Sequence, residues 1–560
     1  MMKTTFEYDH YYDYATIKEN CLYFAKSYPE LVELQSIYKT EKLRDIFALT
    51  LTNKRNGNAL AKPAIYIDAN THAGEVCGSM VAMHTIDYLL TNYGSDAEVT
   101  RLLDDYTFYI IPRISVDGSE VYLKQAYNLR SVDREYLKED EGIYQEDLDD
   151  DNTIRMMRIK NPLGKWKKDP EHELAMIHRL PDDIDGEFYD VYIEGMLDKV
   201  DQLNLFEQRN KWGLDFNRNY PYGWFGEHRQ SGAGAYPLSN PENKAVVDFF
   251  LAHHNIGVVL THHTSGGVIL YPPGTTSEKQ ADADDIKMLK EIGAMGSKEM
   301  DYSCINIFDN FNEDQEFFPS GAFDDWCYQE QGVLAYTLEL WDVRKKAGQP
   351  VDWFAKEPET SQKKLEVFKS LIAFAQKEGL DVIKPWEKVE HPQFKEVEVG
   401  GIAGKFLIQN PPCKFLQQEV ENATRFTLRY AKSLPKIMIY DHEVTKLNDD
   451  TYKVDITLAN KGYLPTYISK EAKKINKAQP IKVTILNGEV SDGNIKQVDG
   501  LAGYALVDSD YSYYGNINTE NREDLKAKVS FIVKTTAASI DVIVFSEKAG
   551  KDSLKIDLMA

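Results

Sequence analysis

A short apolar stretch that runs into polar residues and then into a helix constrains this fold more than any other feature. Residues 64–68, AIYID, have the apolar content of a buried strand, and ANTHAGE follows them at once. The stretch from Glu75 to Leu90 predicts a helix. Other segments predict strands at 45–52, 107–115, 255–274 and 332–342, and helices at 16–27 and 351–379. Strands that alternate with helices predict an α/β sheet.

The length of the chain and a change in its composition predict at least two domains. With 560 residues, the chain is too long for one ordinary core. We expect a first domain at 1–384, with a charged, turn-rich insertion at about 119–211. From about Lys384, segments such as TYKVDITLANKGYLP and KAKVSFIVKT alternate apolar and polar residues. This pattern predicts that residues 385–560 form linker strands and an antiparallel β-sandwich.

Charge and apolar content limit the partners of the chain. A net charge of −24 argues against nucleic acid or an anionic membrane as the main partner, because both require a basic surface. No run of about 18 apolar residues predicts a membrane span. The five cysteines lack paired spacing, so we expect buried free thiols. The N-terminal segment lacks the apolar core of a signal peptide, so we expect a cytoplasmic location for the chain as given. Prior removal of a leader would instead make the chain secreted or periplasmic.

One acidic segment resembles a calcium site without matching it. DLDDDNTI, at 147–154, resembles the first half of a calcium loop. It lacks the central glycine of such a loop, and Arg158 stands where the closing glutamate should be. We therefore expect a solvated acidic turn, with calcium binding as the alternative.

His72 and Glu75 have the spacing of two metal ligands. Side chains three apart on a helical turn lie about 5–6 Å apart at Cβ, and one zinc ion spans that gap. The alternative is a polar helix start in which Glu75 stabilises the helix dipole. A third ligand must come from elsewhere, and His262 and His263 follow an apolar strand. Strand alternation places these two on opposite faces, so only one reaches a shared metal, and periodicity does not choose between them.

With these residues in place, the sequence resembles the zinc carboxypeptidases of the carboxypeptidase A type over about residues 8–380. Four motifs carry the resemblance in order: HAGE (72–75), LDFNRNYP (214–221), HTSGGVILYPPG (263–274) and YTLELWD (336–342). The resemblance implies a mixed, mostly parallel sheet flanked by helices, one Zn²⁺ ion, and hydrolysis of the C-terminal bond of a peptide by a zinc-activated water. It also implies His72, Glu75 and His263 as the zinc ligands, with Gly74 expected to let the backbone turn between the first two.

The same resemblance implies roles for further residues. Asp215 matches the acid that orients a ligand imidazole. Glu339 matches the glutamate that takes a proton from water and delivers it to the leaving amine. In TIRMMRIKNP, Arg158 matches the arginine that stabilises the developing oxyanion, with Arg155 as the runner-up.

Substrate contacts follow from the same motifs. Asn217 and Arg218 match the pair that holds the terminal carboxylate of the substrate, which implies a partner peptide with a free C-terminus. Asp324 matches the specificity residue, and an acid there predicts a preference for C-terminal Lys or Arg. The family's substrate-capping tyrosine is expected near residue 317, where the sequence has phenylalanines, so we assign no residue to it.

Two other functions stay open at this point. An acyl-amino-acid deacylase of the same fold superfamily shares HxxE and a later histidine, although the NRN and DDW segments favour the peptidase. A binding protein with a vestigial, non-catalytic site is the other alternative, and the intact predicted site residues speak against it. The natural substrate, the role of the β-sandwich and the oligomeric state do not follow from the sequence.

Overall fold

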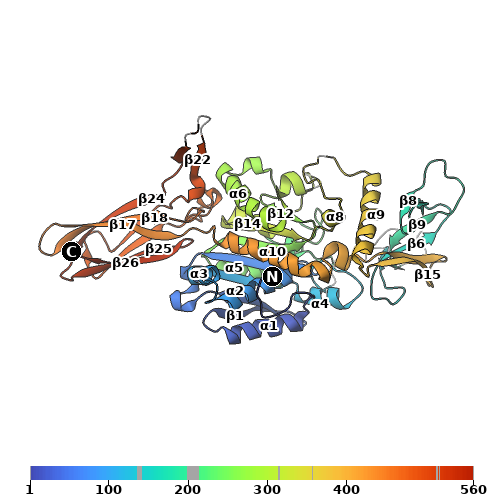
Figure 1. The fold of residues 1–560 in the computed structure, drawn as a ribbon, viewed down its shortest axis with the longest axis horizontal. Coiled ribbons are helices and arrows are strands. Elements are labelled where there is room, and N and C mark those ends of the chain that lie inside the picture. Colours follow the sequence, from blue (N-terminus) through green and yellow to red (C-terminus); the bar gives the residue numbers. More distant parts are fainter. Residues whose placement is uncertain are drawn as a thin grey trace.

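The computed structural model describes residues 2–134, 142–198, 213–312, 314, 316–355, 357–511, 515 and 517–558. The molecule is elongated, with a central α/β body between a lobe of short strands and a C-terminal β unit (Figure 1). Within the described ranges, no helix combines the length and the apolar character that a membrane crossing requires.

An eight-stranded sheet in the order β1-β2-β4-β3-β11-β14-β12-β13 forms the centre of the body. Its strands are β1 (Val32–Lys39), β2 (Asp45–Leu51), β3 (Ala64–Ala69), β4 (Thr107–Ile111), β11 (Ile256–Thr264), β12 (Val268–Tyr271), β13 (Ser303–Asn306) and β14 (Leu334–Leu340). The four central strands β4, β3, β11 and β14 run parallel. β1 and β2 pair antiparallel with their neighbours, and β12 pairs antiparallel with β14 but parallel with β13. The central strands are buried almost throughout because helices cover both faces. The predicted mixed α/β sheet is confirmed.

Helices pack on both faces of this sheet and form two apolar cores. One core contains residues of α1 (Tyr14–Ser27), α2 (Val76–Asn92), α3 (Ala97–Asp105), α6 (Ala283–Met300) and α10 (Cys413–Ala431). The other contains residues of α4 (Val116–Lys124), α5 (Pro241–Ala252) and α7 (Phe323–Gln331). A smaller cluster joins α8 (Val343–Lys346) and α9 (Ser361–Glu378) to the body. Short helical turns are η1 (Lys54–Asn56), η2 (Ala59–Ala61), η3 (Phe216–Arg218), η4 (Glu278–Gln280), η5 (Ile307–Phe311), η6 (Lys405–Gln409) and η7 (Tyr504–Leu506).

The lobe combines the predicted insertion with strands from much later in the chain. Its six-stranded sheet has the order β15-β16-β6-β9-β7-β8, and β5 pairs with β10 beside it. The strands are β5 (Ile143–Gln145), β6 (Met156–Lys160), β7 (Trp166–Lys168), β8 (Met176–His178), β9 (Tyr189–Ile193), β10 (Gly195–Leu197), β15 (Ile383–Val389) and β16 (Val397–Ile402).

This arrangement differs from the predicted division of the chain at residues 384 and 385. The strands expected to be linkers instead pair with the insertion, since β16 lies against β6. Helix α10 packs on α2 and α6, so the body extends past residue 384. The body also continues through α4, where Ser119 is fully buried, so the insertion begins later than about residue 119.

The C-terminal unit is a β-sandwich, as predicted. One antiparallel sheet contains β17 (Ile437–Lys446), β18 (Thr451–Asn460), β24 (Lys526–Lys534) and β20 (Glu489–Val490), in that order. The other contains β21 (Ile495–Val498), β19 (Ile481–Leu486), β25 (Ser539–Ser546) and β26 (Gly550–Asp557). Both contribute side chains to one apolar core. Helix α11 (Lys470–Lys474) and the hairpin of β22 (Val507–Tyr511) and β23 (Ile517–Asn521) accompany them.

Candidate metal centre

Three potential metal ligands from two chain segments meet at the carboxyl ends of β3 and β11. His72 and Glu75 lie between β3 and α2, and His263 lies near the end of β11. The Nδ1 atom of His72 is 2.7 Å from Oε1 of Glu75, and the Nδ1 atom of His263 is 2.8 Å from Oε2. One ligand atom from each residue lies within 4.8 Å of the others, and all three side chains are buried. The structure thus brings together the three residues that the sequence predicts as ligands.

Asn70 holds the loop that carries the first two ligands. Its backbone is left-handed, with a φ of 60°, a conformation in which asparagine is enriched among residues other than glycine. Its Nδ2 atom donates to the carbonyl oxygens of His72 and Ala73, and its Oδ1 atom accepts from the hydroxyls of Ser79 and Ser119. Buried hydrogen bonds therefore fix the loop independently of any bound ion.

Gly74 has a different purpose from the predicted turn. It is not among the residues with positive φ, so its backbone conformation does not require glycine. A Cβ atom at this position would instead lie 2.7 Å from side-chain atoms of both Gln409 and Tyr122. Glycine is needed here because two other segments approach the backbone closely.

Asp215 contacts the outer side of the cluster. Its Oδ1 atom lies 3.1 Å from Nε2 of His72, and its Oδ2 atom accepts from Nε of Arg130 at 2.8 Å. Burial alone would raise the pKa of Asp215, but the positive charges of Arg130 and Arg218 hold it well below its usual range. A charged carboxylate at this place fixes the His72 ring with Nδ1 toward the cluster.

The electrostatics of the three ligands favour a positive charge between them. Burial alone would raise the pKa of Glu75, but the two histidines lower it below its usual range. Burial would lower the pKa of His263, but Glu75 raises it to about 9. The carboxylate of Glu75 thus favours a positive charge beside it, either as a proton on His263 or as a bound cation.

These residues fit a zinc ion. The Nδ1 atoms of His72 and His263 lie only 3.1 Å apart and both contact Glu75. Two imidazoles and one carboxylate are a usual ligand set for a zinc ion with an open coordination position. The contact of Asp215 with the second nitrogen of His72 is the support that metal-binding histidines usually have.

Glu339 lies beside the ligands on the next strand. It is on β14, where its Cα atom pairs with that of His263 on β11. It lines the same pocket of about 250 Å³ as the three ligands. Burial, and then the nearby charge of Glu75, raises the pKa of Glu339 to about 8. A bound cation would favour the charged form of this carboxylate.

Asn217 and Arg218 reach the pocket from η3, directly after Asp215. The Asp215 side chain accepts from the Asn217 backbone N–H and so begins this helical turn. The Asn217 side chain accepts from the backbone N–H of Phe323, and Arg218 donates to the Asn217 carbonyl oxygen at 2.6 Å. Both predicted substrate-binding side chains therefore line the pocket, and Asn217 is anchored to α7.

Two adjacent acids at the start of α7 also line the pocket. Asp324 accepts from the hydroxyl of Thr337 at 2.7 Å, and Asp325 accepts from the Gly274 backbone N–H at 2.8 Å. Burial, and then the charge of Asp324, raises the pKa of Asp325 to about 8. The sequence prediction names only the first of these acids.

Arg158 is not in this pocket, which corrects the prediction from the sequence. It lies on β6 in the lobe, where its Nε atom donates to Glu398 at 2.6 Å and its guanidinium lies over the Trp386 ring. The runner-up, Arg155, pairs with Asp151 in the acidic turn. Both arginines belong to the lobe because β6 pairs with β9 and β16.

Arg130 occupies the pocket instead. Its Nη1 atom lies 3.8 Å from Oε1 of Glu75, and it lines the pocket with Glu339. The sequence prediction missed it because it placed the start of the insertion near residue 119, before this arginine. A usable signal was the short segment QAYNLRS, which follows α4 and precedes the charged stretch.

His262 and the acidic turn are not part of the cluster. His262 is fully buried, its ring nitrogens have no hydrogen-bond partner, and burial lowers its pKa to about 3. A Cβ atom on Gly78 of α2 would lie 2.9 Å from its Cβ, so His262 faces that helix.

In the acidic turn, Lys384 pairs with Asp149 and Asp151, which suits a turn held by side-chain cations.

The aromatic part of the pocket differs from what the resemblance implies. Among the described residues that line it, none is a tyrosine, and Phe311 of η5 contributes an aromatic ring. Phe317 is 71% exposed. No hydroxyl among these lining residues fits the role of the capping tyrosine.

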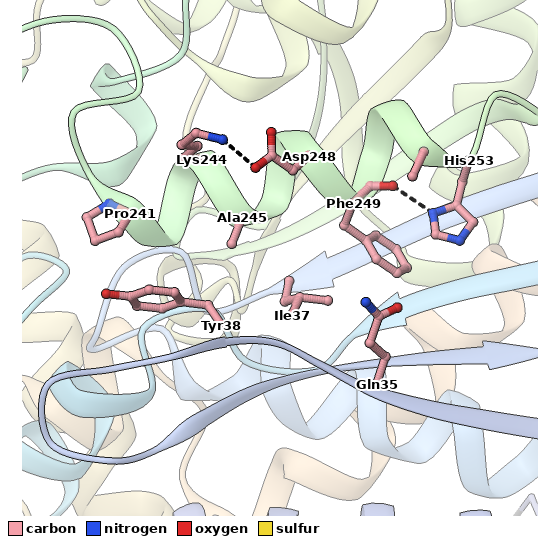
Figure 2. A pocket seen from close by; sticks show the side chains of 10 residues that line it. Gln35, Ile37, Tyr38, Pro241, Lys244, Ala245, Asp248, Phe249 and His253 are labelled. Carbon is pink, nitrogen blue, oxygen red and sulfur yellow. Dashed lines mark hydrogen bonds and ion pairs between the residues drawn. The ribbon is translucent and has the colours of Figure 1, made fainter.

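A second hollow, of about 370 Å³, lies between α5 and the edge strand β1 (Figure 2). Three of its polar side chains already have partners, since Lys244 bonds to Asp248 and His253 to the Phe249 carbonyl oxygen. The hollow is larger than the pocket at the ligands but contains no comparable set of catalytic groups. The chemistry of the chain is therefore expected at the ligand cluster.

Two family models match parts of the chain. A model described as zinc carboxypeptidase matches residues 17–364. A second model, described as a domain of unknown function, matches residues 436–557.

Individual relatives are distant. Mouse carboxypeptidase A4 is 22% identical over 351 residues, and bovine carboxypeptidase B2 is 22% identical over 346 residues. Each alignment covers 60% of this chain, and the chain spans 64% of the length of each relative. Among solved structures, thrombin activatable fibrinolysis inhibitor aligns with a TM-score of 0.45 at 17% identity, over 76% of this chain and 74% of that one.

Proposed function

Because the chain belongs to the zinc carboxypeptidase family, we propose that it is a zinc-dependent metallocarboxypeptidase that removes the last residue of a peptide with a free C-terminus. One observation carries the proposal: His72, Glu75 and His263 present ligand atoms within 4.8 Å of one another, beside the carboxylate of Glu339. Neither a buried ligand cluster nor an adjacent acid is explained by packing alone.

His72, Glu75 and His263 would hold one Zn²⁺ ion, with Asp215 orienting His72. When bound, zinc supplies Lewis-acid chemistry, which polarises a carbonyl group and lowers the pKa of water to about 7. A histidine ligand must be neutral, so zinc would compete with the proton that Glu75 favours on His263.

Glu339 is the general base and acid of the reaction. Its carboxylate takes a proton from the attacking water and then delivers that proton to the amine that leaves. Arg130 is the cation that stabilises negative charge on the carbonyl oxygen, because its guanidinium lines the pocket beside Glu75. This assignment replaces Arg158 in that role.

Arg218 and Asn217 bind the terminal carboxylate of the substrate. A guanidinium fork forms two parallel hydrogen bonds with a carboxylate, which suits an enzyme that recognises a chain end. Asp324 favours a C-terminal Lys or Arg, because its carboxylate lines the same pocket in a buried position.

The test combines metal analysis with assays on blocked dipeptides that end in Arg, Phe or Glu. We expect one zinc per chain, hydrolysis of the C-terminal bond, loss of activity with a chelator, and recovery with zinc. Hydrolysis only of acylated single amino acids would indicate the deacylase alternative. Absence of both metal and hydrolysis would indicate a binding protein.

A further inference from the structure

Residues 404–411, which we call the clasp, bond to chain segments next to Glu75, Arg130 and Glu339. The clasp lies far beyond residue 364, where the zinc carboxypeptidase match ends. The clasp contains η6 and continues to Asn410 and Pro411. It joins the last strand of the lobe, β16, to α10 of the body.

Asn410 bonds to the turn that carries Glu75. Its Nδ2 atom donates to the carbonyl oxygen of Gly74 at 2.7 Å, and its Oδ1 atom accepts from the backbone N–H of Cys77 at 3.0 Å. These two groups flank Glu75 on either side. Asn410 is fully buried, so it fixes the backbone of this ligand from both sides in a low-dielectric environment.

Lys405 bonds to the segment that leads to Arg130. Its ammonium donates to the carbonyl oxygens of Tyr122 at 2.8 Å and Gln125 at 2.6 Å, at the end of α4, and to that of Tyr127 at 3.3 Å. The Tyr122 hydroxyl in turn donates to the Lys405 carbonyl oxygen at 2.9 Å. Lys405 therefore fixes the direction in which the chain leaves α4.

One more contact of the clasp lies near Glu339, and a separate bond joins two of the segments that the clasp supports. The carbonyl oxygen of Leu407 accepts from the indole N–H of Trp341 at 2.7 Å, two residues after Glu339 on the chain. The backbone N–H of Ala73 donates to the carbonyl oxygen of Arg130 at 2.8 Å, so the ligand turn and the arginine segment also bond to each other. One short segment thus supports the backbone near Glu75, Arg130 and Glu339.

We propose that the clasp positions the active site, with Asn410 setting the metal-binding turn and Lys405 setting the segment of Arg130. The proposal rests on the proposed function, and it assigns a role to residues outside the matched family region. Asn410 and Lys405 are positioning residues: they touch neither the ligand atoms nor the pocket, and act through the backbone of residues that do.

The first test compares Asn410→Ala with Asn255→Ala. Asn255 is an equally buried asparagine that bonds to Ala59, Lys62 and Tyr109 at the opposite end of β11 from His263. Zinc affinity, measured by competition with a chromogenic chelator, is expected to fall about tenfold in Asn410→Ala. Asn255→Ala is expected to lower the melting temperature while its zinc affinity stays at the wild-type value.

If Asn410→Ala does not fold, Asn410→Asp replaces it, since the aspartate keeps the acceptor for Cys77 and loses the donor to Gly74. We expect faster release of zinc from this variant than from the wild type. Equal zinc affinity in the wild type and in the folded Asn410 variant would overturn the role of Asn410.

Lys405→Met tests the second half of the proposal, because methionine keeps the apolar stem and removes the three donated hydrogen bonds. We expect kcat to fall about tenfold, less than the 10²–10³ for loss of an oxyanion donor itself, with zinc affinity and KM unchanged. Lys405→Arg is expected to restore most of kcat. An unchanged kcat in Lys405→Met would overturn the role of Lys405.

If the wild-type protein bound no zinc at all, the proposed function would fail and the clasp proposal with it.

Discussion

His262 and His263 differ by a single position along β11, and only one of them joins the ligand cluster. His263 contacts Glu75, whereas His262 lies against α2 with neither ring nitrogen bonded. A strand turns successive side chains to opposite faces, so the choice between them depends on the register of β11 with β3 and β14. Periodicity predicts that the two histidines diverge but not which one faces the pocket.

Glu339→Gln tests the general base at the same scale. We expect the variant to keep its zinc, whereas kcat should fall by about 10²–10⁴-fold, the usual contribution of general acid–base catalysis. The fall is expected because the amide of glutamine does not accept the proton from water. Glu366→Gln, an exposed change on α9, is the control and should leave kcat unchanged. Zinc content and turnover are measured on the same samples. Near-normal turnover in Glu339→Gln would remove this residue from the mechanism.

Asp324→Asn tests the preference for basic residues. The asparagine keeps a hydrogen-bond acceptor for Thr337 but removes the negative charge that attracts a cationic side chain. We expect kcat/KM to fall about tenfold or more for dipeptides ending in Arg, as for loss of a charge-assisted hydrogen bond, and to change little for those ending in Phe. If the wild type already prefers Phe or Glu, the assignment of Asp324 is wrong.

The candidate site was predictable where a motif fixes a residue to the end of a strand. His263 and Glu339 lie near the ends of central strands and His72 and Glu75 in the turn after β3, and the structure brings all four into one pocket. Arg130 was not predictable in the same way, because a long insertion separates this residue from the next motif. Asn410 carried no sequence signal, because its role depends on a contact across 336 positions of the chain.

At the scale of elements, burial decides which strands the sequence reveals. β3, β11 and β14 are nearly continuous apolar runs since helices cover both of their faces, and all three were predicted. The lobe strands are short and partly exposed, and β6 pairs with β16, which lies more than 200 residues later in the sequence. Local pattern does not encode such a pairing, which is why β15 and β16 were assigned to the C-terminal unit.

Glu194 gives the lobe an expected pH dependence. Its carboxylate accepts from the backbone N–H groups of Leu148 and Arg155, joining the acidic turn to the strands. Burial, and then the charges of Asp149 and Asp147, raises the pKa of Glu194 from 4.5 to about 7. Between pH 4.5 and about pH 7, Glu194 holds a proton in the folded state that the unfolded chain has already released. The contribution of Glu194 to the free energy of unfolding therefore falls as the pH rises through this range.

Glu194→Gln removes that contribution. Relative to the wild type, the variant should lose less stability between pH 5 and pH 8, by an amount on the order of 2 kcal/mol. Thermal unfolding of both proteins at the two pH values measures the difference. Parallel pH dependences of the melting temperature would contradict the assignment.

At the scale of the whole molecule, the β-sandwich is built into the body. Leu434, Leu464 and Ile468 belong to the apolar core that also contains residues of α2 and α10. The Ser469 hydroxyl donates to the carbonyl oxygen of Gly332 at the end of α7, and Asp285 of α6 accepts from the first backbone N–H groups of α11. The C-terminal unit is therefore bonded to α6 and α7, and the first turn of α7 lines the pocket.

Truncation after residue 435 tests this integration. Removing the sandwich takes Leu464, Ile468 and Ala505 out of the core that α10 shares with the sheet. We expect a lower melting temperature and exposed apolar surface, measured by calorimetry and dye binding. A truncated chain as stable as the full chain would show that the sandwich is an independent module.

The routes by which the chain enters and leaves the lobe have a mechanical consequence. The segment that leads into the insertion carries Arg130, the segment that returns from it carries Asp215, and these two residues are ion-paired. The last lobe strand leads directly into residues 404–411. Besides the connection from α9 into β15, three connections between the lobe and the body thus carry residues beside or bonded to the ligand cluster. We therefore expect a tilt of the lobe to be transmitted to that cluster.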